Sequence, residues 1–170
     1  MTQNIKDADY WIEILELQPH PEGGYFRETF VADDVISTEL LGRYHNETRK
    51  VYTLIYYLLK SGQVSKFHRL KSDEIWTFHI GSTLTIHVIT KEGEYITKKL
   101  GANVEENESF QHSVKHGSWF GASVDLPDTF ALVGCFVAPG FDFKDFEMGD
   151  KKHLLALCPK HHHILNKLTG

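Results

Sequence analysis

The chain has 170 residues, a mass of 19.5 kDa and a net charge of −5, with 41% hydrophobic and 24% charged residues. This length fits a single domain over residues 1–170, large enough to hold a core without disulfides or structural metal. The acidic balance argues against nucleic-acid and anionic-membrane partners, and no stretch approaches the ~20 apolar residues of a membrane span. The start of the chain lacks a signal-peptide pattern, and its two cysteines fit a reducing compartment, so we expect a cytoplasmic protein.

The first predicted element is a short helix over about residues 6–17. Asp7 or Asp9 can cap it, and Trp11 and Leu15 share a face at helical spacing. The prolines that follow cannot continue a helix, so they mark its end. We therefore expect one N-terminal helix before the rest of the fold.

The following chain consists of short runs rich in β-branched and aromatic residues, separated by turns. Many short strands without helices between them predict an antiparallel sandwich or barrel. We expect this barrel over residues 19–150, after an N-terminal segment 1–18 and before a tail 151–170 that can hold a second helix. The predicted strands are Tyr25–Val31, Lys50–Leu59, Ser65–Leu70, Ile75–Ile80, Leu84–Thr90, Glu94–Leu100, Ser109–Val114, Trp119–Val124 and Ala131–Ala138.

A glycine-bracketed stretch, residues 62–81, has the most chemical content. His68 and Glu74 lie six residues apart across a short connection, so they can converge from adjacent strands. Alternation places Trp76 and Phe78 on the same face as Glu74. A carboxylate is costly to bury among aromatic rings without a partner, and a histidine is a natural partner. The spacing alone is equally compatible with a structural hydrogen bond and with a functional site.

This stretch resembles the first motif of the cupin superfamily. A second cupin motif aligns at Gly117. Two positions that hold metal-binding histidines in cupins are Leu70 and Phe120 here. The residues that match the first motif are Gly62, His68, Glu74 and Gly81.

The whole chain resembles one cupin subfamily, cupin-5 or DUF985, over about residues 10–150. Three segments carry the resemblance: His20–Phe30, Phe67–Trp76 and Val137–Glu147. It implies an all-β double-stranded β-helix, an antiparallel jelly-roll barrel, here with a short N-terminal helix. It also implies a homodimer, which would cover strand edges such as Tyr25–Val31. It implies no established reaction.

The donor set argues against a metal site. Catalytic transition-metal sites generally use at least three protein ligands, and His68 and Glu74 supply two. Leu70 and Phe120 have no lone pair to donate, so we expect no resident metal and no other cofactor. Further histidines are expected to point away from the pocket (His79), to face either way (His87) or to lie near the barrel rim (His112 and His116).

The segment from Tyr25 to Phe30 alternates, so one charge of the Arg27 and Glu28 pair can point inward. On pattern alone, a solvated edge strand with an ion pair is slightly favoured. The segment is also loosely similar to an early strand of the metal-free sugar-nucleotide 3,5-epimerases. Those enzymes use a histidine base on the strand where His68 would lie, followed by a glutamine that is Leu70 here.

Two segments near the C-terminal end of the barrel are predicted to be structural. The acidic residues Asp142, Asp145 and Glu147 alternate with aromatic residues, which favours a strand with one apolar and one solvated face. Cys135 is predicted to be a small buried core residue.

We expect His68 and Glu74 to form the polar centre of a small-molecule pocket, with the Glu74 carboxylate raising the pKa of His68. The most favoured activity is a metal-independent, epimerase-like or isomerase-like enzyme that acts on a small polar metabolite or sugar derivative, with His68 as the acid–base group. The alternative is a non-catalytic binding protein with a degenerate cupin metal site. The expected ligand-binding residues are Arg27, Glu28, Trp76, Phe78, Trp119 and Phe120.

Overall fold

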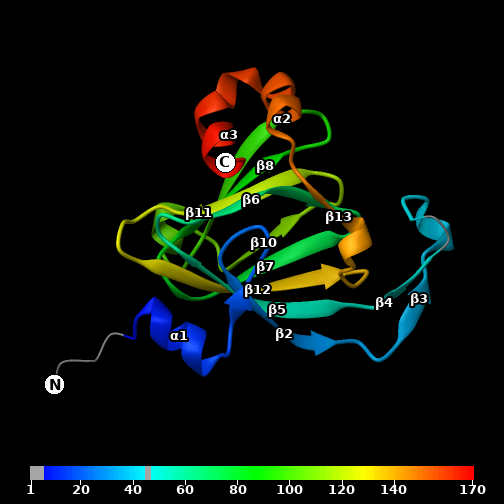
Figure 1. Ribbon diagram of the computed structural model, residues 1–170, viewed down its shortest axis with the longest axis horizontal. Coiled ribbons are helices and arrows are strands. Elements are labelled where there is room, and N and C mark those ends of the chain that lie inside the picture. Colours follow the sequence, from blue (N-terminus) through cyan, green and yellow to red (C-terminus); the bar gives the residue numbers. More distant parts are fainter. Residues whose placement is uncertain (1–5, 45–46) are drawn as a thin grey trace.

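The structure is a computed structural model that describes residues 6–44 and 47–170 (Figure 1). Two antiparallel sheets face each other and enclose the main core, which confirms the all-β jelly roll expected from the sequence. The first sheet contains, in spatial order, β1 (Gln18–Pro19), β2 (Tyr25–Val31), β5 (Thr53–Lys60), β12 (Phe130–Ala138), β7 (Asp73–Gly81) and β10 (Gln111–Val114). The second contains β13 (Phe146–Met148), β6 (Val64–Leu70), β11 (Trp119–Val124), β8 (Leu84–Ile89) and β9 (Tyr95–Leu100).

Two terminal helices cover the outer face of the second sheet, α2 (Lys151–Leu157) and α3 (His162–Leu168) (Figure 1). Leu165 and Leu168 pack there against Phe67 and Trp119. Every residue of β8 and of β11 is buried, because one face of each strand meets the barrel interior and the other meets these helices. The polar residues on these strands, Thr85, His87 and Ser123, are therefore buried as well, and each has a hydrogen-bond partner.

The N-terminal helix α1 (Ala8–Ile14) is shorter than the predicted 6–17. Asp7 caps its first turn by accepting a hydrogen bond from the Tyr10 backbone N–H at 2.9 Å. The helix ends before the prolines, because Glu16 adopts a left-handed φ of 53°. Its apolar face packs on the outer side of the first sheet.

The chain crosses from one sheet to the other between β6 and β7. The expectation that His68 and Glu74 come from adjacent strands is therefore wrong, since β6 pairs with β11 and β13, whereas β7 pairs with β10 and β12. The two side chains instead approach from facing sheets. Sequence spacing could not distinguish these arrangements, because a short connection can join either kind of strand pair.

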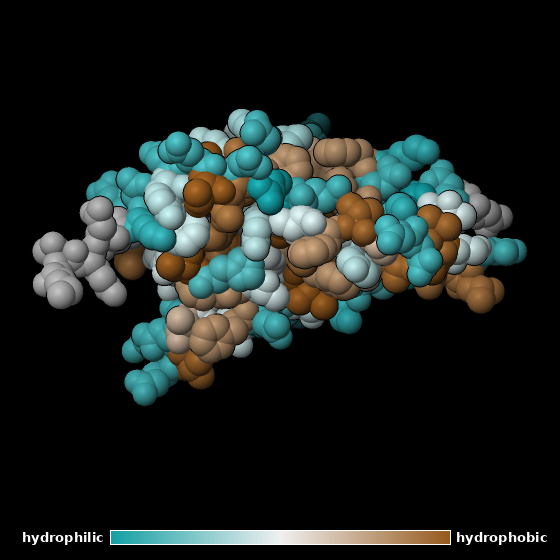
Figure 2. Space-filling view, turned by 90° about the horizontal axis from the view of Figure 1, so that it is seen from below, coloured by the Kyte–Doolittle hydropathy of each residue, from teal (hydrophilic) through white to brown (hydrophobic). Residues whose placement is uncertain are grey.

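A small hairpin, β3 (Val35–Ser37) with β4 (Thr48–Lys50), projects from one end of the barrel (Figure 1). It carries exposed apolar side chains, among them Val35 at 59% and Leu40 at 98% exposure. Apolar surface is visible at this end in Figure 2. Among the described residues, no helix is long and apolar enough to cross a membrane.

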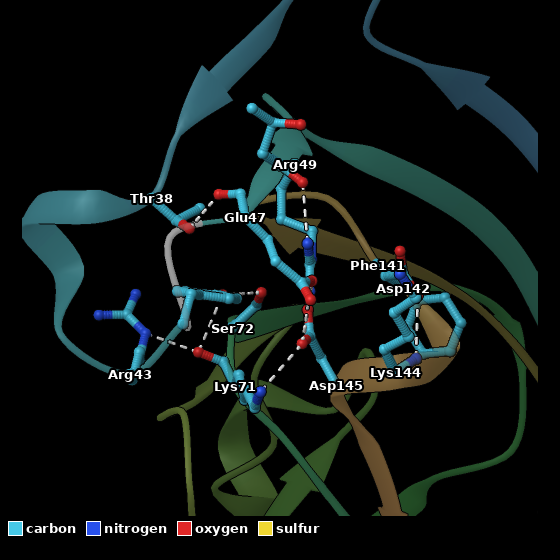
Figure 3. A network of polar contacts seen from close by, with 12 residues as sticks. Thr38, Arg43, Glu47, Arg49, Lys71, Ser72, Phe141, Asp142, Lys144 and Asp145 are labelled. Carbon is cyan, nitrogen blue, oxygen red and sulfur yellow. Dashed lines mark hydrogen bonds and ion pairs between the residues drawn. The ribbon is translucent and has the colours of Figure 1, made fainter.

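A buried ion pair ties this hairpin to the barrel (Figure 3). The Arg49 guanidinium donates to both oxygens of Asp145, from Nε at 2.6 Å and from Nη2 at 2.8 Å. Arg49 Nη2 also lies 2.6 Å from Glu47. The prediction that Asp145 belongs to a strand with a solvated face is wrong: it ends a short 3-10 turn, Phe143–Asp145, and is buried because Arg49 compensates its charge.

Candidate functional site

A cavity of about 110 Å³ lies between the two sheets, at the end of the barrel that carries the hairpin. Strands of both sheets line it, and its walls are apolar and aromatic around a small set of polar groups. This composition is typical of ligand pockets. The lining residues are His20, Glu22, Phe26, Glu28, Thr53, Ile55, Tyr57, His68, Leu70, Glu74, Cys135, Val137, Phe141, Phe143 and Phe146.

Glu22 is the most constrained polar group of the pocket. It lies in the turn before β2, where Gly23 adopts a φ of 113° and lies so close to β6 that a Cβ would be 2.1 Å from the Val64 carbonyl oxygen. Only glycine fits there, so the backbone itself directs the Glu22 side chain inward. Its Oε1 accepts a hydrogen bond from Ser65 at 3.0 Å, and its Oε2 lies 3.1 Å from His68 Nδ1.

His68 is buried and its ring is held on several sides. Nδ1 lies 2.7 Å from the Lys66 carbonyl oxygen, so this nitrogen carries the proton and Nε2 carries the lone pair. The ring packs on Phe120 at 4.1 Å and on Phe146 at 5.2 Å between centroids. The fold therefore fixes both the orientation and the tautomer of this imidazole.

His20 completes the polar side of the pocket. Its Nδ1 accepts a hydrogen bond from the Glu22 backbone N–H at 3.3 Å and lies 3.8 Å from Glu22 Oε2. Its ring makes edge contacts with Phe26 at 4.6 Å and with Tyr57 at 6.0 Å. Two imidazoles thus flank one carboxyl group.

Burial favours the uncharged form of each of these groups, so it raises the pKa of the acids and lowers that of the histidine. Burial raises the pKa of Glu22 to about 7 and that of Glu74 to about 8. Repulsion from Glu22 raises the pKa of Glu74 further, whereas a hydrogen bond with Cys135 lowers it. Burial lowers the pKa of His68 to about 4, partly offset by its bond to Lys66. The expectation that a carboxylate raises the pKa of His68 is therefore wrong, since burial lowers this pKa and the only opposing contribution is the hydrogen bond to the Lys66 carbonyl oxygen.

The predicted pair, His68 and Glu74, lines this one pocket. Of the predicted ligand-binding residues, Glu28 also lines it, on its exposed side. Arg27 points away, because it donates to the Leu15 carbonyl oxygen and pairs with Glu16, both at 3.0 Å. The inward-pointing charge of β2 is thus that of Glu28.

The predicted aromatic walls lie elsewhere. Trp76 and Phe120 are in the core behind the pocket, where Trp76 contacts the lining residue Tyr57. Trp119 lies on the outer face of its sheet under the terminal helices, and Phe78 lines a different, open cleft at α1. Strand alternation gave the inward face correctly for Trp76 and Phe120, but it could not give their depth along the barrel.

The sequence does not predict a place in the pocket for His20, Glu22 or Tyr57, whereas Cys135, predicted as a buried core residue, is buried and also lines the pocket. His20 and Glu22 belong to an irregular turn, where no periodicity indicates which side chains point inward. The available signal was the segment from His20 to Gly24, in which two titratable residues precede paired glycines. Such a turn can bring a backbone close to another strand.

The residues present do not fit a metal ion. Among the described residues, no group of three or more histidine, cysteine or acidic side chains is arranged to hold one. Leu70 lines the pocket where a cupin ligand would stand, and the Phe120 ring packs on His68. His68 Nδ1 is engaged with Lys66, which leaves one nitrogen for any other contact.

The four further histidines considered from the sequence have partners outside the pocket. His79 is exposed and contacts Tyr56, and His87 lies between Tyr95 and Ser123 at 2.7 and 3.0 Å. The other two, His112 and His116, contact the Lys99 carbonyl oxygen and Asp73, respectively. None of these four lines the cavity.

A jelly-roll barrel with a polar-centred pocket between its sheets is the architecture of a cupin. Comparison with known sequences agrees: the family described as Cupin superfamily (DUF985) matches residues 9–149. The chain therefore belongs to this family.

Relatives span nearly the whole chain. A hypothetical protein from Leishmania major superposes with a TM-score of 0.86 at 37% identity, over 95% of this chain and 98% of that one. Protein SO0799 from Shewanella oneidensis has a TM-score of 0.86 at 40% identity, over 98% and 99% of the two chains. Uncharacterized protein YML079W from Saccharomyces cerevisiae is 33% identical over 155 residues, 83% of this chain and 76% of that protein.

Proposed function

We propose that this cupin binds a small polar metabolite in the pocket and moves a proton on it without a metal. The observation that supports this most is the Glu22 carboxyl group, buried and held 3.1 Å from a neutral imidazole. A pKa of about 7 leaves this group able both to take and to give a proton near neutral pH. That property is what general acid–base catalysis requires.

We assign the proton transfer to Glu22 rather than to His68. With a pKa of about 4, His68 is a weak base at neutral pH, but its fixed Nε2 lone pair can accept a hydrogen bond from a ligand hydroxyl group. Glu74, with a pKa of about 8, is mostly protonated at pH 7 and can donate a hydrogen bond to a carbonyl oxygen. The three groups thus divide into one acid–base group, one acceptor and one donor.

The cavity restricts the ligand. Its volume of about 110 Å³ is below the roughly 300 Å³ at which pockets for drug-sized ligands begin, so the bound part is a small metabolite or a fragment of a larger one. The ionised form of Glu22 would repel a negative group beside it, which favours an uncharged polar part such as a carbonyl with adjacent hydroxyl groups. This chemistry includes small sugars and their derivatives.

The proposed reaction is an epimerisation or isomerisation. The Glu22 carboxylate removes a proton from the carbon next to the carbonyl, and the electron pair moves to the carbonyl oxygen, which the Glu74 hydroxyl stabilises. Return of the proton to the same carbon on its opposite face, with the carbonyl re-formed, gives an epimer. Return of the proton to the former carbonyl carbon gives an isomer, because the adjacent hydroxyl group then becomes the new carbonyl and its proton passes to the former carbonyl oxygen. No oxidant or metal is consumed.

A deuterium-exchange screen tests the proposal. The protein is incubated in D₂O with small aldoses and ketoses, and loss of the exchanging C–H signal is followed by proton NMR. We expect exchange at one carbon, slowed at least ~100-fold in Glu22→Gln, because general acid–base groups contribute about that much. Glu13→Gln, on the exposed side of α1, is the matched control and should leave the rate unchanged.

The alternative, a non-catalytic binding protein, predicts a different outcome. A ligand would then bind to the parent protein without any exchange, and Glu22→Gln would change affinity alone. Equal exchange in the parent and in Glu22→Gln would overturn the assignment of the proton transfer to Glu22.

A further inference from the structure

A second, strongly basic cleft of about 270 Å³ adjoins the pocket, and Leu70 and Phe146 line both. Five lysine or arginine residues and two carboxylates line the cleft, so its charge is +3 in a chain whose net charge is −5. Such a local excess attracts anions. The cationic residues are Arg43, Arg69, Lys71, Lys91 and Lys144.

The two carboxylates of the cleft are already neutralised by close partners. Asp145 is buried and receives two hydrogen bonds from Arg49, which is not a lining residue. Glu147 pairs with Arg69, whose Nε and Nη2 lie 2.8 and 2.7 Å from its Oε2. These acids therefore offset little of the charge of the remaining cations.

Three cations of the cleft make no ion pair within 4 Å in the part of the chain that the structure describes: Arg43, Lys91 and Lys144. Lys144 still affects one acid, Glu47, whose pKa is lowered by its hydrogen bond with Arg49 and further by Lys144. Arg43 is nevertheless held in place, because its Nε donates to the Lys71 carbonyl oxygen at 2.6 Å (Figure 3). That bond leaves the two terminal nitrogens of the guanidinium for another acceptor. A surface charge held in place without a counter-charge is suited to bind an anion.

The turn after β10 makes room for one of these cations. Gly117 adopts a φ of 74°, and a Cβ there would lie 2.5 Å from Lys91 Cε. The glycine thus lets the Lys91 side chain lie across the turn at the edge of the cleft. Three separate segments, around Arg43, Lys91 and Lys144, converge in this way.

We propose that the cleft binds a phosphate group, either as the free anion or as the phosphate ester of a small metabolite. An arginine fork combined with lysine point charges suits a phosphate dianion, which accepts several charge-assisted hydrogen bonds at once. The cleft is a single small concavity rather than an extended basic stripe, so it does not suit a nucleic acid. This proposal is independent of the chemistry assigned to Glu22.

Calorimetric titration at low ionic strength tests the site with two probes, inorganic phosphate and glycerol phosphate. We expect saturable binding of one equivalent, weakened at least tenfold in the double variant Lys91→Gln/Lys144→Gln. The control, Lys151→Gln/Lys152→Gln, removes the same charge from exposed positions of α2 and should bind as the parent does. Tighter binding of the ester would assign the cleft to a phosphorylated metabolite, and equal binding would assign it to the free anion.

A second measurement uses the parent protein alone and follows the NMR signal of one backbone amide in the cleft. During the phosphate titration of the parent protein, the backbone amide signal of Gly117 should shift and saturate together with the heat. No saturable binding of either probe, no shift of this amide, or equal weakening in both double variants would overturn the proposal, the last because it would indicate a general charge effect.

Discussion

Glu74 shows how one buried carboxyl group sets a pH dependence of stability. Its folded pKa of about 8 lies above the ordinary value of 4.5, so between these pH values the folded state keeps a proton that the unfolded state loses. The contribution of this group to stability is therefore full below about pH 4.5 and is lost as the pH rises towards 8.

The variant Glu74→Gln removes this titration. Its stability relative to the parent should rise with pH between 5 and 8, by up to about 1.4 kcal/mol per pH unit. Urea unfolding at several pH values measures the difference, with Glu13→Gln as the exposed control. Parallel stability curves for Glu74→Gln and the parent would show that Glu74 ionises normally in the folded state.

The turn before β2 positions the polar side of the pocket. Gly23→Ala should be more destabilising than Gly62→Ala, although both glycines have a left-handed φ, of 113° and 81°. At Gly62 nothing lies within 4 Å of the added methyl group, so only backbone strain of roughly 1–2 kcal/mol is expected. At Gly23 the methyl group also meets the Val64 carbonyl oxygen.

Chemical denaturation and the NMR signals of the His68 ring measure both effects. The ring signals should move in Gly23→Ala, because Glu22 is displaced, and stay unchanged in Gly62→Ala. Equal destabilisation by the two substitutions, with unchanged His68 signals in both, would show that the turn does not position Glu22.

The ion pair between Arg49 and Asp145 joins the hairpin to the barrel. Asp145→Ala leaves Arg49 buried with one partner, Glu47, and should cost about 3–5 kcal/mol of unfolding free energy. The double variant Arg49→Met/Asp145→Leu leaves no uncompensated buried charge and should be closer to the parent in stability. A cost below about 1 kcal/mol for Asp145→Ala would mean that the pair behaves as an exposed one.

The elements were predictable from the sequence to different degrees. The bounds of β2 and β11 match the predicted strands, because runs of aromatic and β-branched residues between flanking turns mark them. A register shift between Glu28 and Phe30 breaks the expected alternation and leaves Phe30 62% exposed. A bulge of this kind depends on the partner strand, which the local sequence does not contain.

The candidate site was predictable in part. Motif spacing identified His68 and Glu74, but not Glu22, which approaches from a turn 46 residues earlier in the chain than His68. That approach depends on how the turn packs on β6, a tertiary contact without a periodic signal. The pKa directions likewise depend on burial depth, which alternation does not give.

For the whole molecule, an uncovered strand edge supports the proposed homodimer. The short strand β1 pairs only with Tyr25 and Phe26, so among the described residues the outer edge of β2 from Arg27 to Val31 has no strand partner. The exposed ring of Phe30 lies in this segment. Long exposed edges of this kind are usually covered.

Light scattering should therefore give about 39 kDa, twice the chain mass of 19.5 kDa, at micromolar concentrations. Phe30→Lys should shift the mass towards the monomer, because a lysine on an edge disfavours pairing. A mass of one chain at every concentration would contradict the dimer.

Carbon-13 NMR of the glutamate carboxyl groups across pH 3–9 measures the protonation of the pocket residues directly. The Glu22 signal, assigned by its loss in Glu22→Gln, should titrate with a midpoint near pH 7, while His68 stays neutral down to about pH 4. A Glu22 midpoint near the ordinary 4.5 would contradict the account, because the carboxyl group would then be a solvated surface charge and not the acid–base group of an enclosed pocket.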